Sequence, residues 1–272
     1  MAKYTLQNKV VIITGASSGI GLACAKEFAS KGAKLMLAAR NTDKLNELAA
    51  GLRKNGNDVE ICTTDVSIEE DCKKLIESTI NKFGKIDILI NNAGLSMRAA
   101  FQQVDLSVLK RLMDVNFWGT VYCTKYALPY LLANKGSVTG VSSVAGLHGL
   151  PGRTGYSSSK YAMQGFLDTL RIETLKKGLH VMVAIPGFTA SNVRLSALTA
   201  DGSQQGETPR NEEKMMSAEE VAQRIVKGIE RRKRTLLMTY EGKLTPVLKL
   251  LFPKWLDNMY YKHMKKEPDS PI

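Results

Sequence analysis

Two side chains four residues apart, Tyr156 and Lys160, are candidates for proton chemistry. In a helix this spacing places both on one face. A free phenol has a pKa of about 10, and a nearby ammonium favours the phenolate and lowers that pKa. The pair would then be a proton donor or acceptor suited to neutral pH. The spacing also fits a packed tyrosine and a solvated lysine, because Tyr-x-x-x-Lys occurs by chance in many helices.

A glycine-rich loop follows the first predicted strand. Gly15, Gly19 and Gly21 lie between residues 10–14 and a predicted helix. Backbone N–H groups in such a loop can approach a pyrophosphate, and the helix N-terminus adds positive potential. The alternative, a merely flexible loop, is disfavoured by the position between first strand and first helix. The spacing Gly-x-x-x-Gly-x-Gly differs from the common dinucleotide fingerprint, so it indicates a particular family.

The end of the second predicted strand selects the cofactor. Enzymes that bind NAD carry an acidic residue there for the ribose 2′-hydroxyl, whereas this strand ends in Ala38-Ala39-Arg40. A guanidinium can hold a 2′-phosphate by charge-assisted hydrogen bonds. We therefore predict NADP(H), bound by Arg40 with help from Ser17. The competing interpretation is that Arg40 is an ordinary surface residue.

Short apolar runs alternate with longer helical patterns, which predicts a single-domain, Rossmann-type doubly wound α/β sheet of about seven parallel strands with helices on both faces. Capping boxes at Ser67 with Glu70 and Ser217 with Glu220 predict two of the helix starts. The predicted strands are Val10–Thr14, Lys34–Ala39, Asp58–Thr63, Ile86–Asn91, Ser137–Val141, His180–Ile185 and Thr235–Thr239. The predicted helices are Ile20–Lys31, Asp43–Asn55, Ile68–Phe83, Leu106–Leu132, Tyr156–Lys177 and Ala218–Arg231.

One polar stretch, 195–216, has no clear period, and long connections of this kind are usually lids or disordered segments. It follows the sixth strand, at the end of the sheet where ligands bind. We predict one domain over residues 1–242, with a substrate lid at 188–216. Residues 243–272 then form a helical C-terminal extension of the same domain.

A series of short motifs follows one another along nearly the whole chain. They are Thr14–Gly21, Asp65-Val66, Asn91-Asn92-Ala93-Gly94, Asn116, Val141-Ser142-Ser143, Tyr156-Ser157-Ser158-Ser159-Lys160 and Pro186-Gly187. In these motifs the chain resembles the short-chain dehydrogenase/reductase family. Its ending, Thr239-Tyr240-Glu241-Gly242-Lys243, stands where many 3-oxoacyl-thioester reductases of the family have an aspartate–glycine–glycine turn. The ending therefore resembles the hydroxysteroid-dehydrogenase-like branch.

The resemblance implies a catalytic set of four residues. Ser143 would hydrogen-bond the substrate oxygen, and the family's usual offset from the tyrosine favours it over Ser142. Tyr156 would protonate that oxygen during reduction, and Asn116 would hold a water in a proton relay. Lys160 would bind the nicotinamide ribose and lower the tyrosine pKa.

The same resemblance implies the cofactor contacts. Asp65 and Val66 would contact the adenine, Asn91 would line the cleft, and Thr189 would contact the nicotinamide carboxamide. The full predicted set is Gly15, Ser17, Ser18, Gly19, Ile20, Gly21, Arg40, Asp65, Val66, Asn92, Ala93, Gly94, Tyr156, Lys160, Pro186, Gly187 and Thr189.

The implied activity is interconversion of a carbonyl and an alcohol by hydride transfer, with no metal. Residues expected at the substrate are mostly apolar, which favours a lipophilic carbonyl or alcohol such as a steroid or retinoid. Alternatives are a 3-oxoacyl-thioester reductase and a non-catalytic NADPH-binding sensor or scaffold, although a sensor need not keep all four catalytic residues. The predicted substrate residues are Ser143, Met97, His148, Leu150 and Phe188, with Ser96 and Met215 beside them.

The bulk composition excludes few partners. A net charge of +12 favours anionic ligands, but the basic run 231–234 is better explained as a solvated helix end than as a nucleic-acid site. Four scattered cysteines predict reduced thiols and a cytoplasmic protein. The start of the sequence leaves no room for a signal peptide before the first strand, and no apolar run reaches the roughly 20 residues of a membrane span.

The extension places Leu244, Leu248, Leu251, Trp255 and Met259 at helical spacing, interrupted by Pro253 and flanked by lysines. Such a pattern fits a helix on an anionic membrane surface. Packing on its own subunit or on a partner subunit is the favoured alternative. Family resemblance implies a homodimer or homotetramer through helices near 106–132 and 156–177.

Overall fold

The strands of the sheet are built from apolar runs without alternation. All five residues of β1 (Val10–Thr14) are buried, as expected for a strand covered on both faces. The computed structural model describes residues 4–189, 194–206 and 215–272. Seven strands pair there in the order β3-β2-β1-β4-β5-β6-β7, and every pairing is parallel. The others are β2 (Lys34–Ala39), β3 (Val59–Thr63), β4 (Ile88–Asn91), β5 (Ser137–Val141), β6 (His180–Ile185) and β7 (Thr235–Leu237).

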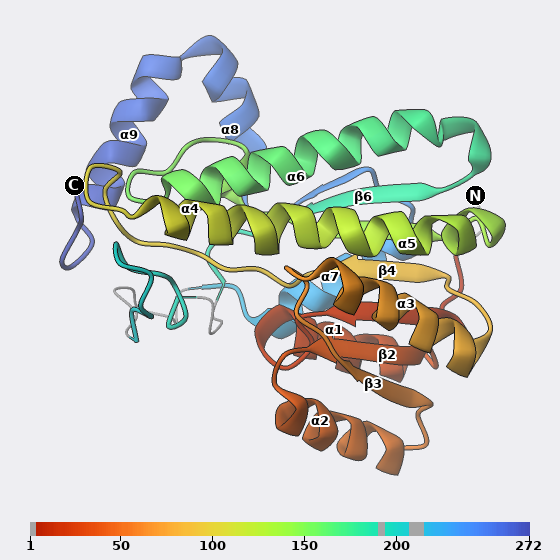
Figure 1. Cartoon of the computed structure of the whole chain (residues 1–272). Helices are drawn as coiled ribbons and strands as arrows, with labels where there is room; N and C mark the ends of the chain where they lie inside the picture. The colour runs from red at the N-terminus through yellow and green to blue at the C-terminus, as the bar shows by residue number, and fades with distance from the viewer. Residues whose placement is uncertain (1–3, 190–193, 207–214) are drawn as a thin grey trace.

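Helices cover both faces of this sheet (Figure 1). One face packs on α1 (Gly19–Ser30), α2 (Thr42–Lys54) and α7 (Ala218–Glu230). The other face packs on α3 (Glu69–Phe83), α5 (Gly119–Ala133) and α6 (Thr154–Glu173), with α4 (Leu106–Met113) beside α6. The predicted doubly wound α/β fold is thus confirmed.

The strand order reverses between β1 and β4. From β1 the chain builds outward to β3 and then returns to pair β4 on the other side of β1. The loops that leave these two strands therefore diverge, and a crevice opens at their carboxyl ends. This crevice holds the candidate site.

The long helix predicted over 106–132 is interrupted. A π-helical turn, Asp114–Trp118, separates α4 from α5. Single π turns inside helices are often found at functional sites, and this one carries Asn116. The Thr120 hydroxyl donates to the Asn116 carbonyl at 3.0 Å, and so satisfies a backbone group near the break.

The two predicted capping boxes have different outcomes. Ser217 accepts a hydrogen bond from the Glu220 backbone N–H at 3.0 Å, which confirms its cap of α7. The Ser67 box is wrong, because α3 is preceded by Ile68 without a side-chain cap. The Ser67 hydroxyl instead donates to Asp65 at 2.6 Å, a local contact that competes with capping.

Local caps and turns also move some predicted boundaries. β7 ends at Leu237 rather than Thr239, because Thr239 accepts a hydrogen bond from the Gly242 backbone and caps α8. α6 begins at Thr154 and ends at Glu173, and a 3-10 turn, Leu175–Lys177, follows it.

The C-terminal extension forms two helices, α8 (Tyr240–Leu251) and α9 (Pro253–Lys265). Pro253 lies in the first turn of α9, where its missing N–H costs nothing. α8 starts three residues before the predicted boundary of the extension, and Leu256 and Tyr260 of α9 join the core on the α6 side. In the described part of the chain, the helices lack the length and apolarity that crossing a bilayer requires.

His180, at the start of β6, predicts an acid-sensitive fold. Its ring nitrogens lie 2.9 Å from the Ser137 hydroxyl and 2.8 Å from the Lys233 carbonyl. Burial lowers the pKa of His180 to about 4. Between pH 6.5 and 4, His180 is protonated in the unfolded chain but neutral in the folded chain. The free energy of unfolding therefore decreases as the pH falls through this range.

We expect His180→Gln to remove that loss. The wild-type chain should lose about 2–3 kcal/mol of unfolding free energy to this group by pH 4.5. Urea unfolding of both chains at neutral and acidic pH measures the difference. An identical pH dependence in the two chains would contradict the assignment.

Candidate active site

The glycine loop after β1 needs its glycines for space and for backbone conformation. Gly15 has φ +65°, and a Cβ there would lie 2.9 Å from the Ala93 Cα. A Cβ on Gly21 would lie 2.2 Å from the Gly15 carbonyl oxygen. Gly21 is not in the pocket wall, so it acts by letting the loop close, and its contact with the cofactor stays a prediction.

A second loop, after β4, is tied to the first. The Thr14 hydroxyl accepts from the backbone N–H groups of Asn92 and Ala93 at 3.0 and 3.1 Å. The Asn92 amide donates to the Thr14 carbonyl at 2.9 Å and to the Gly15 carbonyl at 3.2 Å. Asn91 is turned away, and its amide donates to Thr124 at 3.0 Å; its predicted place in the cleft is therefore wrong.

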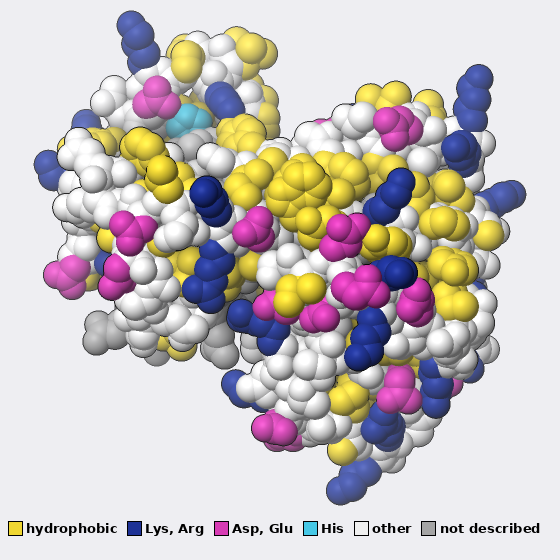
Figure 2. All heavy atoms as spheres, viewed as in Figure 1, with side chains coloured by type: hydrophobic (Ala, Val, Ile, Leu, Met, Phe, Trp, Pro, Cys, Tyr) yellow, Lys and Arg dark blue, Asp and Glu magenta, His cyan; other side chains and the backbone are white. Residues whose placement is uncertain are grey.

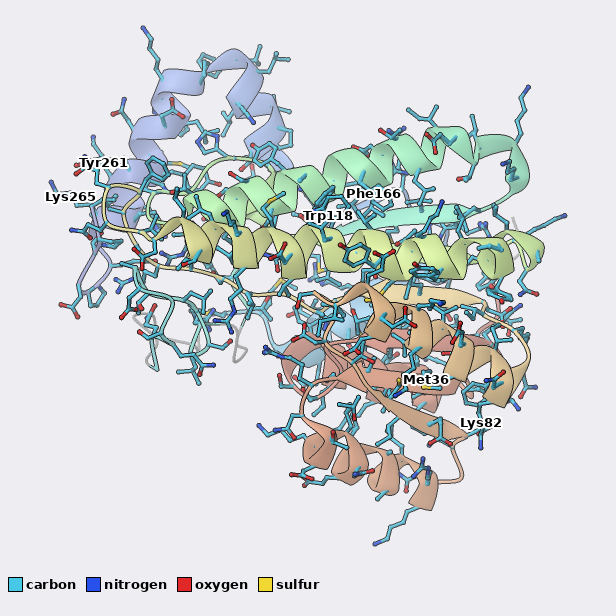
Figure 3. All side chains as sticks on the ribbon, viewed as in Figure 1. Met36, Lys82, Trp118, Phe166, Tyr261 and Lys265 are labelled. Carbon is cyan, nitrogen blue, oxygen red and sulfur yellow. The ribbon has the colours of Figure 1, made fainter. Side chains whose placement is uncertain are left out.

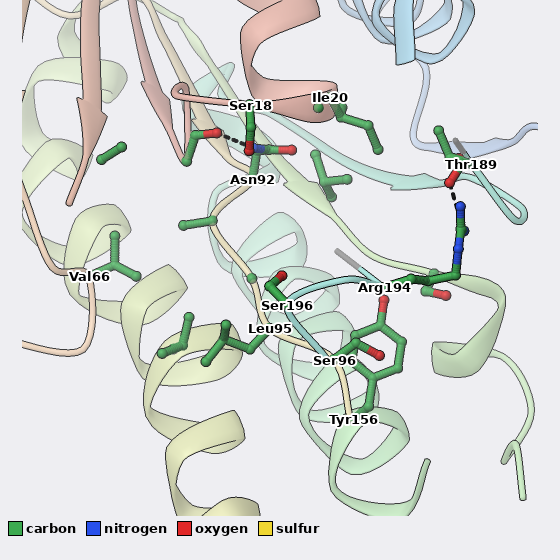
Figure 4. A pocket seen from close by; sticks show the side chains of 18 of the residues that line it. Ser18, Ile20, Val66, Asn92, Leu95, Ser96, Tyr156, Thr189, Arg194 and Ser196 are labelled. Atoms are coloured by element: carbon green, nitrogen blue, oxygen red, sulfur yellow. Dashed lines mark hydrogen bonds between the residues drawn. The ribbon is translucent and has the colours of Figure 1, made fainter. Parts of the chain in front are cut away.

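A pocket of about 630 Å³ lies over these loops, at the carboxyl ends of the strands (Figure 4). Most of the predicted cofactor residues line it, including Ser17, Ser18 and Ile20 from the glycine loop. The other predicted residues in its wall are Gly15, Gly19, Arg40, Asp65, Val66, Asn92, Ala93, Gly94, Ser143, Leu150, Tyr156, Lys160, Pro186, Gly187, Phe188 and Thr189.

One end of the pocket carries two cations. Arg40 follows β2, is exposed, and lines the pocket together with Asn41 and Lys44. Asn41 caps α2 by accepting from the Lys44 backbone N–H at 2.9 Å. The sequence analysis did not predict Lys44 as a site residue, although its position in the first turn of the helix after Arg40 was a usable signal. The pocket wall at this end includes Asp65, whose carboxylate is held by the Ser67 backbone and hydroxyl.

The other end gathers three predicted catalytic groups. The Ser143 hydroxyl faces the Tyr156 phenol closely enough to lower its pKa, and it accepts the Ala145 backbone N–H at 3.2 Å. The Lys160 Nζ lies 5.8 Å from the centre of the Tyr156 ring and donates to the Val141 carbonyl at 2.9 Å. The pocket wall contains all three side chains, and Figure 4 shows Tyr156 pointing into the pocket. Ser142 also lines the pocket, but its hydroxyl is bound by the Gln164 amide at 2.8 Å.

The net shift of the Tyr156 pKa in this arrangement is upward, opposite to the net lowering that the sequence predicts. Burial raises the pKa of Tyr156, against the opposing influence of the Ser143 hydroxyl and the Arg153 guanidinium. Burial also lowers the pKa of Lys160 to about 8. The phenol is therefore protonated at neutral pH, while the lysine is close to the pH at which it loses its charge.

Asn116 lies behind this group and outside the pocket wall. Its amide is fixed by the Leu95 backbone N–H and carbonyl at 2.8 and 2.9 Å, and by the Ser159 hydroxyl at 2.8 Å. A Cβ on Gly94 would lie 3.1 Å from the Asn116 Oδ1 and 3.4 Å from the Lys160 Nζ. Because Gly94 has no side chain, the Asn116 amide and the Lys160 amine can both lie close to its backbone.

Two predicted substrate residues are wrong. Met97 is fully buried among Leu112 and other core side chains, and its sulfur accepts the Gly155 backbone N–H. His148 faces the extension, with its Nε2 3.2 Å from the Asp257 carboxylate and its ring stacked on Tyr260 at 4.9 Å. Both lie outside the pocket wall, because tertiary packing gives them other partners.

The predicted substrate residues Leu150 and Phe188 do line the pocket, and so does Ser96. Met215, which was expected beside them, does not line it. Of the predicted lid, 190–193 and 207–214 lie outside the described residues.

Sequence reasoning missed two guanidinium groups in the pocket wall, Arg153 and Arg194. Arg194 donates to the Thr189 carbonyl at 2.8 Å (Figure 4). Arg153 lies 3.5 Å from Glu267, near the C-terminus. Arg153 directly precedes α6 and stands one helical turn before Tyr156, which was a usable signal.

The glycine loop lies where the strand order of the doubly wound sheet reverses, which is where such folds bind dinucleotides. A tyrosine, a lysine and a serine lie in the same crevice. Together these features are those of an α/β oxidoreductase that uses a dinucleotide. The model of the short chain dehydrogenase family matches residues 9–201. The chain belongs to this family.

Curated relatives point to the same branch as the sequence. A "Dehydrogenase/reductase SDR family protein 7-like" from Dictyostelium discoideum is 35% identical and covers 94% of this chain and 82% of its own length. The "11-beta-hydroxysteroid dehydrogenase 1A" of Arabidopsis thaliana is 36% identical and covers 93% and 74%. These relatives confirm the predicted hydroxysteroid-dehydrogenase-like branch. The general activity of the chain is that of a dehydrogenase/reductase.

A solved short chain dehydrogenase/reductase from Burkholderia phymatum, in complex with NAD, has the same fold. Its TM-score is 0.82 at 24% identity, over 93% of this chain and 96% of its own.

Proposed function

We propose that the chain is an NADP(H)-dependent oxidoreductase that interconverts a carbonyl and an alcohol on a lipophilic substrate. The observation that carries the proposal is that Tyr156, Ser143 and Lys160 lie together in the pocket wall, with the phenol protonated and the Lys160 Nζ 5.8 Å from the centre of its ring. The family membership supports the general activity, and the residues at the two ends of the pocket support the finer statement.

The pocket fits a nicotinamide dinucleotide. At Gly15 and Gly21 any side chain would collide with backbone, so the loop keeps its N–H groups open to a pyrophosphate. Arg40 and Lys44 would bind a 2′-phosphate, and we therefore propose NADP(H) over NAD(H). When bound, the cofactor supplies or accepts the hydride.

Tyr156 and Ser143 would act on the substrate oxygen. In reduction, negative charge grows on that oxygen, and two hydroxyl donors stabilise it more in the transition state than before. The raised pKa of Tyr156 keeps its proton in place until the oxygen becomes basic enough to take it. The Lys160 ammonium and the Ser143 hydroxyl would then stabilise the phenolate. Asn116 would orient the water that returns the proton.

A substrate panel tests the proposed class. We expect NADPH-dependent reduction of ketosteroids or retinals, because Leu95, Leu150 and Phe188 provide apolar wall. NADPH consumption and product analysis measure it. Activity confined to acyl thioesters would overturn the lipophilic substrate. NADPH binding without turnover of any carbonyl would indicate a sensor or scaffold instead.

The second candidate is a 3-oxoacyl-thioester reductase, or an enzyme for another substrate that carries an anion. Arg153 and Arg194 favour it, because guanidinium groups in a pocket wall select carboxylates and phosphates. Acyl thioesters in the same panel separate this candidate from the first.

A second copy of the chain is the partner we propose for the face of α5 and α6. Exposed apolar side chains on this face and at its ends include Trp118, Ile172 and Leu175, and Figure 3 shows Trp118 and Phe166 along these helices. Whether two or four copies assemble stays a prediction.

A further inference from the structure

The corner between α8 and α9 exposes large apolar side chains. Leu250 is 81% exposed, and Phe252 and Trp255 are each 57% exposed. Single exposed apolar residues need no explanation, whereas a cluster of large ones does. We name this cluster the α8–α9 corner; its members are Leu244, Val247, Leu250, Leu251, Phe252 and Trp255.

The corner is separate from the face that attaches the extension to the body. Leu256, Tyr260 and Met264 are buried on the opposite side of α9. Tyr260 also shares a hydrogen bond with Thr245 of α8 at 3.1 Å. This inner face accounts for the packing of the extension on its own domain. The corner adds nothing to that packing, so its apolar surface requires another explanation.

Positive charge surrounds the corner. Between residues 240 and 266 there are six lysines against two carboxylates, Glu241 and Asp257. Lys254 is exposed within the corner itself and Lys243 is exposed next to Leu244. Farther along α9, Lys265 lies 5.7 Å from the Tyr261 ring centre, and Figure 3 shows the two side chains together.

The shape of the hairpin formed by α8 and α9 favours contact with a broad, deformable surface such as a lipid bilayer. Figure 1 shows α8 and α9 standing out from the sheet as a hairpin, and Figure 2 shows apolar side chains at its tip. A projecting apolar tip among lysines can enter the headgroup layer of a bilayer, while the lysines contact anionic lipids. A second copy that offered the same corner would bring like charges together.

We propose that the α8–α9 corner is a peripheral docking site for an anionic lipid bilayer. Trp255 and Leu250 enter the interface, and Lys243 and Lys254 bind headgroups. Docking also positions the pocket. In α9, Tyr260 stacks on His148 and His263 lies 6.3 Å from Phe188 of the pocket wall. A lipophilic substrate could then enter from the bilayer; that route rests on the proposed function, whereas the bilayer contact does not.

Tryptophan fluorescence tests the insertion directly. The chain has two tryptophans, so Trp118→Phe leaves Trp255 as the sole reporter in the full-length chain. We expect its emission to shift to the blue with vesicles of phosphatidylcholine carrying about 30% phosphatidylserine, and much less with phosphatidylcholine alone. Raising the ionic strength should weaken the binding. Unchanged emission with anionic vesicles would overturn the proposal.

Vesicle sedimentation with charge-introducing variants locates the contact. Leu250→Glu should weaken binding at least about tenfold, because it removes an inserted side chain and repels the headgroups. Ile68→Glu is the matched control, since Ile68 is 51% exposed directly before α3, outside the pocket wall and on an element that does not belong to the extension or to the α5 and α6 face, and it should bind as the parent does. Equal losses in both variants would overturn the proposal.

Light scattering separates the other possible occupant, and circular dichroism with NADPH binding checks that the variants are folded. We expect Leu250→Glu to keep the parent's mass in solution. A fall in mass confined to this variant would show that the corner binds a second copy, and would overturn the bilayer assignment. Vesicle binding does not require turnover, so failure of the proposed enzymatic function would not produce either result.

Discussion

Tyr156→Phe lowers the turnover number about 10²–10⁴-fold, while the dissociation constant for NADPH changes less than about twofold. The size is that of a lost general acid. The variant keeps the ring that packs in the pocket and removes only the hydroxyl that faces Ser143. Single-turnover reduction of the best carbonyl from the panel, together with NADPH titration, measures both quantities.

The same helix supplies the control. Tyr161 is exposed, lies outside the pocket wall, and its hydroxyl accepts a hydrogen bond from Lys249 at 2.6 Å. Tyr161→Phe should therefore retain turnover within about twofold. If Tyr156→Phe stayed as active as this control, the acid would have to be another group.

Arg40→Asp is expected to lower kcat/KM for NADPH about a hundredfold and to leave kcat/KM for NADH unchanged or higher. A charge-assisted hydrogen bond contributes roughly 1.5–3 kcal/mol, and the new carboxylate would repel a 2′-phosphate while suiting a 2′-hydroxyl. Steady-state kinetics with each cofactor gives the ratio. A wild-type chain that prefers NADH would already refute the assignment of Arg40.

Lys54→Asp makes the same charge reversal at the other end of α2. Lys54 is exposed and lies outside the pocket wall, unlike Lys44 in the first turn of that helix. Its cofactor preference should match the wild type. An equal change in both variants would mean that the preference follows net charge through long-range attraction, and not a specific contact.

Much of the fold and pocket was predictable because the relevant signals are local. Continuous apolar strands, a glycine loop and the Tyr-x-x-x-Lys spacing each depend on neighbours a few residues away. Arg40 could be placed for the same reason, since the end of β2 is also the wall of the crevice. These features did not require knowledge of which helices pack together.

The errors in the pocket arose where a partner distant in the sequence fixes a side chain, whereas the error at Ser67 has a local cause. By their positions in the chain, Met97 and His148 were expected in the pocket. Met97 instead packs against α4 and α6. His148 contacts the Asp257 carboxylate and the Tyr260 ring of α9. The Ser67 cap failed because an aspartate two residues earlier took its hydroxyl.

The sequence by itself determined the α/β class, the family and the identity of the reactive phenol, amine and serine, because those depend on residue type and short spacing. Only the tertiary structure decided the protonation of Tyr156 and the two faces of the extension. Burial, Ser143 and Arg153 together set the phenol's pKa, and packing of Leu256 and Tyr260 leaves Leu250 and Trp255 exposed. Solvent exposure is a property of the assembled chain, and no local spacing encodes it.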